Sequence, residues 1–184
     1  MEWNIPGTVL SIDVSQTGQM EEKIAAMFLG GGMVLSQVAA VTGLELYTIQ
    51  NWVKRGFLTK PVNKKYTLRQ LCRIININML KDALRMEQIV SLMSYINGHL
   101  DDESDDLIDD SKLYFLFLKI AASHRQMKDP GGRDTFISEA LAEYTEPIPG
   151  ARERVEKVLQ VMLTAWAAAL LRQQAVAMAD QLSI

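Results

Sequence analysis

Apolar positions recur at helical spacing along most of the chain, and few stretches alternate as half-buried strands do. Helices are therefore predicted at about 19–29, 36–42, 45–55, 68–85, 86–99, 111–124, 135–144 and 151–182. Residues 1–15 are predicted to be irregular or a short strand, with a turn at Pro6-Gly7, and Met127 to Asp134 to be a loop. The predicted fold class is mainly α.

Two of these helices lie close together between Leu35 and Leu58. Gly43 separates them, and glycine tolerates the positive φ that closes a helix C-terminus. Ser36 has a suitable side chain for the N-cap of the first helix. Helix, glycine turn and helix follow one another in this order in a helix-turn-helix, whose second helix can enter the DNA major groove.

The second helix separates its side chains by chemistry at about 100° per residue. Its apolar side carries Leu46, Ile49, Trp52 and Val53, and its polar side carries Tyr47, Gln50, Asn51 and Lys54. The hydroxyl, amide and ammonium groups of the polar side suit base edges and phosphates. An ordinary amphipathic helix with a solvated face has the same pattern, so the surrounding sequence has to decide between the two.

The segment after this helix, TKPVNKKYT, is suited to a short wing. Pro61 interrupts regular structure, and Asn63 with Lys64 can form the tip of a tight hairpin between two small strands. Thr67 resembles the N-cap of the next helix. That helix is expected to turn Leu71, Cys72, Ile74, Ile75 and Ile77 inward and Arg69, Arg73 and Asn76 outward.

The charge of the chain is unevenly distributed. Residues 33–86 contain nine Lys or Arg against Glu45 and Asp82, a net charge of +7, whereas the whole chain carries −3. One basic stretch in an otherwise acidic chain indicates a surface that faces a polyanion. The acidic run from Asp101 to Asp110 is either a solvated loop or a segment that folds over the basic patch and weakens DNA binding.

Residues from Leu35 to about Met93 resemble the DNA-binding domain of MerR-type transcriptional regulators. The matching elements are LSQVAAVTG, Thr48-Ile49 with Trp52, Gly56-Phe57-Leu58, Lys65-Tyr66-Thr67 and the turn Arg85–Ile89. More narrowly, NWVKRGFL with KKYTLRQL resembles an uncharacterised bacterial MerR-like family known as a domain of unknown function. The chain departs from the MerR pattern at Gln50, where that family has an arginine, and in its short wing.

The resemblance implies a MerR-like winged helix-turn-helix with a C-terminal helical extension, double-stranded DNA as partner and a homodimer joined by a long C-terminal helix. The expected division is 1–32 as a lead-in, 33–100 as the DNA-binding domain and 101–184 as the helical region. The candidate DNA-binding residues are Ser36, Gln37, Tyr47, Thr48, Gln50, Asn51, Lys54, Arg55, Lys60, Lys64, Lys65, Tyr66 and Arg69.

The predicted helix at 151–182 is longer than a small domain needs. Val155, Leu159, Met162, Trp166 and Ala169 alternate four and three residues apart, which is the spacing of a seam between helices. The seam can serve a dimer or pack inside the chain against the helix at 111–124, and we expect both.

The function expected from these features is that of a sequence-specific, dimeric DNA-binding transcriptional regulator. The alternative is a protein-interaction or small-ligand-sensing module that keeps the fold without strong DNA binding. An effector, whether small molecule or protein, stays open. The single cysteine, Cys72, and the isolated His99 and His124 give no metal site, cofactor site or catalytic group, so we expect no enzyme. No signal peptide or membrane span is predicted, which favours the cytoplasm.

Overall fold

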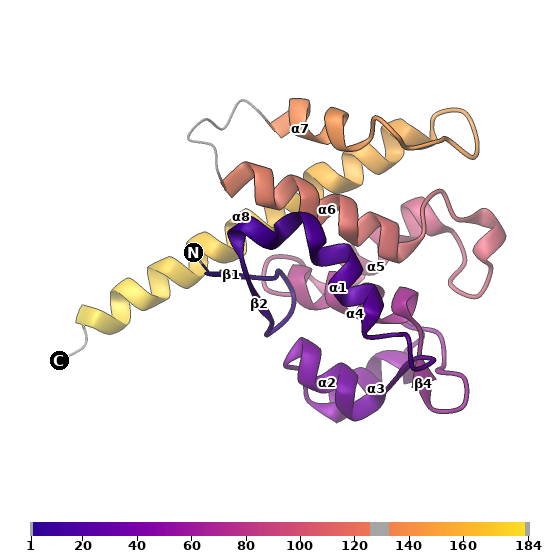
Figure 1. Ribbon diagram of the computed structural model, residues 1–184, viewed down its shortest axis with the longest axis horizontal. Coiled ribbons are helices and arrows are strands. Elements are labelled where there is room, and N and C mark those ends of the chain that lie inside the picture. Colours follow the sequence, from indigo (N-terminus) through magenta and orange to yellow (C-terminus); the bar gives the residue numbers. More distant parts are fainter. Residues whose placement is uncertain (1, 126–132, 183–184) are drawn as a thin grey trace.

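The computed structural model describes residues 2–125 and 133–182, and most of them lie in helices (Figure 1). The α-helices are α1 (Met20–Ala26), α2 (Leu35–Thr42), α3 (Leu46–Lys54), α4 (Leu68–Leu80), α5 (Met86–Asn97), α6 (Asp110–Arg125), α7 (Arg133–Ala140) and α8 (Ala151–Leu182). The 3-10 helices are η1 (Val14–Gln19) and η2 (Glu103–Asp105). The mainly α class is confirmed. Of the loop predicted at Met127 to Asp134, residues 127–132 lie outside the described residues, and the last two residues belong to α7.

Two small antiparallel sheets complete the described part of the chain. β1 (Glu2–Asn4) pairs with β2 (Ser11–Asp13), with Trp3 opposite Ile12. β3 (Met33–Val34) pairs with β4 (Lys65–Tyr66), with Met33 opposite Tyr66. The second sheet joins the strand before α2 to the strand before α4, so it fixes the two ends of the α2–α3 unit.

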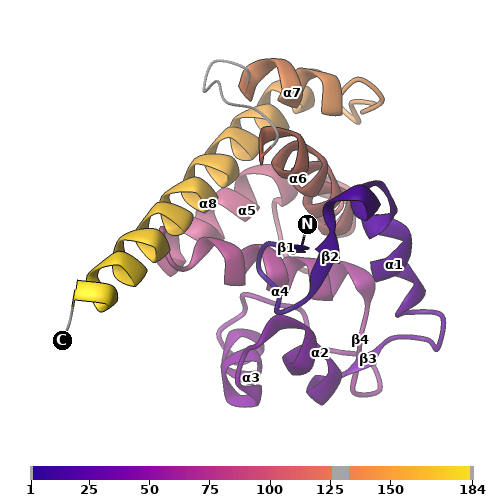
Figure 2. The same cartoon turned by 60° about the vertical axis from the view of Figure 1, so that its left-hand side comes forward.

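α4 is the central helix and is buried along almost its whole length, in contact with α2, α5, α6 and α8 (Figure 2). Its start is fixed by Thr67 and Gln70: the Thr67 Oγ1 accepts from the Gln70 N–H, and the Gln70 Oε1 accepts from the Thr67 N–H. The N-cap predicted at Thr67 is therefore confirmed. The outward side predicted for Arg73 and Asn76 is wrong, because α6 covers that side and buries both.

The N-terminal hairpin belongs to the same core as α4. The Asn78 Nδ2 donates to the Gly7 carbonyl at 2.9 Å, and the Tyr114 hydroxyl donates to the Pro6 carbonyl at 2.8 Å. Gly7 has φ +75° and lies so close to α4 that a Cβ there would be 2.6 Å from the Ile75 carbonyl oxygen. One hydrophobic cluster runs from Trp3 to the α8 helix, so the three expected parts of the chain share a core.

The two halves of α8 have different surroundings. The first half packs against the body, and the second half projects from it toward the C-terminus (Figures 1 and 2). Four of the five residues predicted for the dimer seam, Val155, Leu159, Met162 and Ala169, are buried within the chain, and the ring of Trp166 meets that of Phe117 edge-on at 5.8 Å. This seam is therefore an internal one, which corrects its assignment to a dimer interface. Beyond Ala169 every described residue of α8 is exposed.

Candidate nucleic-acid interface

α2 and α3 lie at one end of the molecule, opposite α7 (Figures 1 and 2). Gly43 joins them in the left-handed conformation at φ +69°, and its N–H donates to the Ala39 carbonyl at 2.8 Å. α2 begins one residue earlier than predicted. The N-cap residue is Val34, so Ser36 lies inside the helix and does not cap it. The Gln37 Oε1 accepts from the Val34 N–H at 2.9 Å.

α3 has one buried side and one exposed side, as predicted. Ile49 and Trp52 are buried and hold the helix on the core. The exposed side carries Tyr47, Gln50, Asn51 and Lys54, with Tyr47 67% exposed. Leu46 departs from the prediction: it is 46% exposed, because nothing in the described part of the chain covers the first turn of α3 on that side.

A tight turn lies between Pro61 and β4. Asn63 and Lys64 have φ of +50° and +62°, and Val62 pairs with Lys65 across them. Two successive positive φ angles between paired residues are characteristic of a type I′ hairpin turn. The predicted hairpin around Asn63 is therefore present, reduced to a single bridge that continues into β4.

α3 and the hairpin turn border a groove of about 610 Å³, which we call the α3 groove. It is lined by Val34, Leu35, Ser36, Leu46, Gln50, Val53, Pro61, Lys64 and Tyr66. The structure thus brings together four of the predicted residues, Ser36, Gln50, Lys64 and Tyr66, from α2, α3, the hairpin turn and β4. The candidate list from the sequence lacks the five apolar residues Val34, Leu35, Leu46, Val53 and Pro61. Only the pairing of β3 with β4 places Val34 beside the hairpin.

Five exposed cations lie on α3 and on the segment that follows it: Lys54, Arg55, Lys60, Lys64 and Lys65. The Arg55 guanidinium stacks over the Phe57 ring at 4.6 Å, and the Lys65 Nζ donates to the Gly30 carbonyl at 3.2 Å. Neither contact neutralises the charge. This end of the molecule therefore keeps a positive face with Glu45 as the one acidic residue on α3 or its N-cap.

Two predicted DNA contacts have other roles. The Tyr66 ring is buried, and this burial raises the pKa of its hydroxyl. Arg69 is surrounded by carboxylates: its guanidinium pairs with Asp106 and approaches Glu103 at 3.2 Å, Asp110 at 3.7 Å and Asp109 at 3.8 Å. Arg69 is thus occupied by the acidic segment, which corrects its assignment to a phosphate.

The acidic segment also reaches the connection after α3. The Arg73 Nη1 donates to the Asp110 Oδ2 at 3.2 Å, and the Arg73 Nε donates to the Phe57 carbonyl at 3.0 Å. The Gln70 Nε2 donates to the Thr59 hydroxyl at 2.8 Å. α4 therefore holds the exit of α3 on one side and the start of α6 on the other. The acidic run therefore does fold over basic residues. These are Arg69 and Arg73 of α4, and not the exposed lysines of α3 and the hairpin turn.

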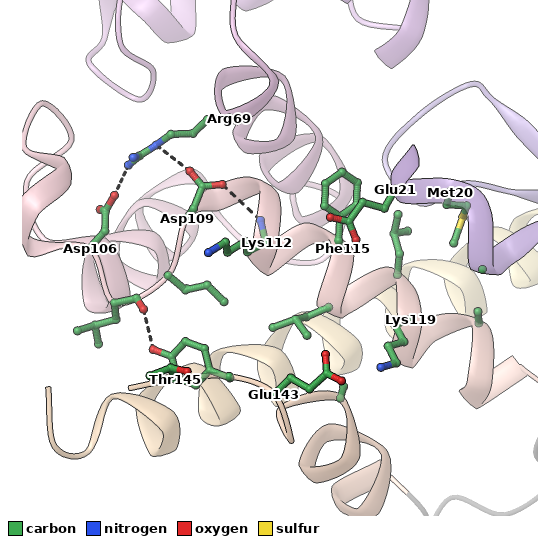
Figure 3. A pocket seen from close by; sticks show the side chains of 18 of the residues that line it. Met20, Glu21, Arg69, Asp106, Asp109, Lys112, Phe115, Lys119, Glu143 and Thr145 are labelled. Carbon is green, nitrogen blue, oxygen red and sulfur yellow. Dashed lines mark hydrogen bonds and ion pairs between the residues drawn. The ribbon is translucent and has the colours of Figure 1, made fainter. Parts of the chain in front are cut away.

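A larger cleft of about 1000 Å³ lies beside this segment (Figure 3). Figure 3 shows Arg69 with Asp106 and Asp109 on one wall and Glu21, Lys119 and Glu143 around the rest. Burial raises the pKa of Asp106, and the neighbouring Arg69 opposes the shift. The lining combines five carboxylates, three cations and apolar residues of α6.

Of the two histidines, only His99 has a described side chain, and it takes part in no candidate site. His99 is exposed, and its backbone N–H donates to the Asp105 Oδ2 at 2.9 Å; the side chain of His124 lies outside the described residues. Across 2–125 and 133–182, no group of three or more His, Cys, Asp or Glu is placed to hold a metal ion. In the same residues, no helix has both the length and the apolar character needed to cross a membrane.

The fold and this face define a mainly helical protein with a basic end built from α2, α3 and a hairpin turn. Residues 32–117 match the family described as a domain of unknown function (DUF1836), which covers all of these elements. The chain is also 25% identical over 128 residues to an uncharacterized protein of Bacillus subtilis (strain 168), YkrK. That match covers 67% of this chain and 54% of the relative, so the chain spans about half the length of the curated relative. No solved structure matches the chain.

Proposed function

We propose that the protein is a sequence-specific DNA-binding transcriptional regulator and not an enzyme, with a MerR-like winged helix-turn-helix formed by α2, α3 and the hairpin turn. The observation that carries this proposal is the exposed side of α3. Tyr47, Gln50, Asn51 and Lys54 project from a helix whose opposite side is locked into the core by Ile49 and Trp52. A helix held in this way can present its polar side chains to base edges in the major groove.

The positive face supports the same proposal, because phosphate contacts provide most of the affinity for DNA and fix its orientation. Lys60, Lys64 and Lys65 are on the segment that includes the hairpin turn, the place of a wing that contacts the phosphate backbone. Such a regulator would act on double-stranded DNA in the cytoplasm of a bacterial cell.

The distal half of α8 supports a homodimer. Leu171, Met178 and Leu182 are 66, 67 and 82% exposed, and with Ala175 they follow one another four, three and four residues apart on one side of the helix. A short isolated helix is only marginally stable in water, and an exposed apolar stripe favours pairing with a second helix. We therefore propose this distal stripe, in place of the buried seam, as the contact between two copies.

Selection from a random duplex library with the purified full chain tests the proposal. We expect an enriched motif, and Asn51→Ala should change which sequence is preferred. The double substitution of Lys64 and Lys65 by alanine should weaken binding to all duplexes and reduce the slope of log K against log salt by about 2. Lys119→Ala, which removes an exposed lysine far along the chain on α6, is the matched control and should leave binding unchanged. A selection without an enriched motif would refute the regulator.

The homodimer is tested separately by light scattering. We expect twice the monomer mass at micromolar concentration, and Leu171→Glu with Met178→Glu should yield monomers. Gln173→Glu adds a charge on the opposite side of the same helix and should leave the dimer intact. A monomeric mass for the unaltered chain would contradict the proposed dimer and would leave the proposed DNA contacts of α3 unaffected.

The second candidate function, a module that senses a small ligand, is favoured by the 1000 Å³ cleft. Its volume is at the upper end of the range for ligand pockets. Under this alternative the DNA selection fails, while a small molecule raises the melting temperature of the chain, and Lys119→Ala at the cleft wall reduces that increase.

A further inference from the structure

The α3 groove is mainly apolar although it lies among exposed lysines. Six of its nine lining residues are apolar: the buried Tyr66 and five residues that are at least partly exposed, Val34, Leu35, Leu46, Val53 and Pro61. Leu46 and Val34 are 46 and 40% exposed. A contiguous exposed apolar surface inside a polar rim is typical of a contact that a partner covers.

The charges around the α3 groove restrict the chemistry of that partner. Lys64 lines the groove, and Lys54, Lys60 and Lys65 are exposed nearby in sequence on α3 and the hairpin segment. A fitting partner is negatively charged on its flanks and offers an apolar group between them. The DNA major groove has this combination, because the thymine C5-methyl is the apolar group that a base pair exposes there and phosphates run along both edges.

One stripe of α3 faces the groove. Leu46, Gln50 and Val53 are four and three residues apart and all three line it. The Gln50 side chain is exposed and makes no hydrogen bond to any other part of the described chain. A glutamine amide can accept from N6 and donate to N7 of adenine at the same time. The stripe therefore offers an adenine-reading amide between two side chains suited to a thymine methyl.

We propose that the α3 groove reads A·T base pairs, with Leu46 against a thymine methyl and Gln50 on an adenine of the same or the adjacent pair. This inference rests on the proposed DNA-binding function and deepens it by naming the base pair. The neighbouring stripe of Tyr47, Asn51 and Lys54 contacts other bases or phosphates. Leu46, which is 46% exposed, thus has a role in recognition and not in the core.

The test uses the best duplex from the selection, with each thymine replaced in turn by deoxyuridine. This change removes the methyl group and keeps base pairing. We expect at least one position where the dissociation constant rises about fourfold, the value for one buried methyl-sized group. Leu46→Ala should bind the thymine and deoxyuridine duplexes equally at that position. Gln50→Ala should lose the preference for A·T over G·C in the same or the adjacent pair.

Asn51→Ala is the matched control, since Asn51 lies on the neighbouring stripe of the same helix. It should weaken binding and keep the deoxyuridine effect. If deoxyuridine changes nothing at any position of an enriched motif, the A·T inference is overturned while the regulator stands. Should no duplex be enriched and an acidic amphipathic peptide bind the α3 groove instead, the proposed function is overturned too.

Discussion

Arg73 and Asp110 form a buried ion pair that ties the exit of α3 to the start of α6, and we predict a large effect when it is broken. The Asp110 side chain is 1% exposed, and that of Arg73 is 9% exposed. Asp110→Ala leaves the Arg73 guanidinium in the same place with the Phe57 carbonyl as its remaining close acceptor.

The expected magnitude follows from this geometry. Removing one partner of a buried ion pair costs about 3–5 kcal/mol, because the other charge stays desolvated. Since Arg73 keeps its contact with Phe57, we expect Asp110→Ala to lower the free energy of unfolding by about 3 kcal/mol. Replacing both residues by apolar ones, Arg73→Met with Asp110→Leu, should recover most of this loss, because no unpaired charge remains.

The assay is urea denaturation at pH 7 followed by far-UV circular dichroism, with the unaltered chain, Asp110→Ala and the double variant measured together. A loss below about 1 kcal/mol for Asp110→Ala would refute the reasoning, since that is the size of an exposed ion pair. Equal losses in the single and double variants would also refute it, because the unpaired charge would then not be the cause.

The pH dependence gives a second measurement on the same residue. Burial raises the pKa of Asp110 above its ordinary 3.8, with Arg73 opposing the shift. Between pH 3.8 and this raised pKa the folded chain therefore binds more protons than the unfolded chain, so the free energy of unfolding falls as the pH rises through that range. Asp110→Asn removes this contribution, and its stability should fall less with rising pH over that window than that of the unaltered chain.

Two further predictions concern a backbone contact and the acidic segment. Gly7 and Gly56 share φ +75°, but of these two only Gly7 lies against a backbone oxygen. In the same urea assay Gly56→Ala should therefore lower the free energy of unfolding by about 1–2 kcal/mol, and Gly7→Ala by clearly more. Equal losses would contradict the close contact at Gly7. Asp101→Asn with Glu103→Gln removes two exposed charges and should raise DNA affinity at low salt, where screening is weakest. An unchanged dissociation constant would dispose of an electrostatic effect of this segment on DNA binding.

The helices could be predicted from sequence because apolar spacing and capping residues are local signals. Gly43 and Thr67 act as their neighbours indicate, and α8 has the predicted bounds. The surroundings of a helix are not local. Arg73 and Asn76 were expected outside because they are polar, yet α6 covers them from more than 30 positions away and supplies the Asp110 carboxylate.

The candidate site has the same limit. The polar side of α3 follows from residue spacing, so Tyr47, Gln50 and Asn51 were identified correctly as exposed. Leu46 was assigned to the core from its apolar character, which does not tell whether another element reaches it. Arg69 is paired with Asp106, which lies more than 30 residues later in the chain. No sequence pattern around Arg69 predicts that this acidic segment folds back onto it.

The N-terminal hairpin has a consequence for the synthesis of the chain. Trp3 and Ile12 leave the ribosome before α4, and the Tyr114 hydroxyl that closes on Pro6 is 108 positions further on. During translation the hairpin therefore emerges before α4 and α6, against which it packs. α2 and α3 likewise emerge before α4, which supports them. Contacts between such distant positions slow folding. α4, against which α2 packs, therefore gains its partner α6 only after α2, α3 and α4 have all been synthesised.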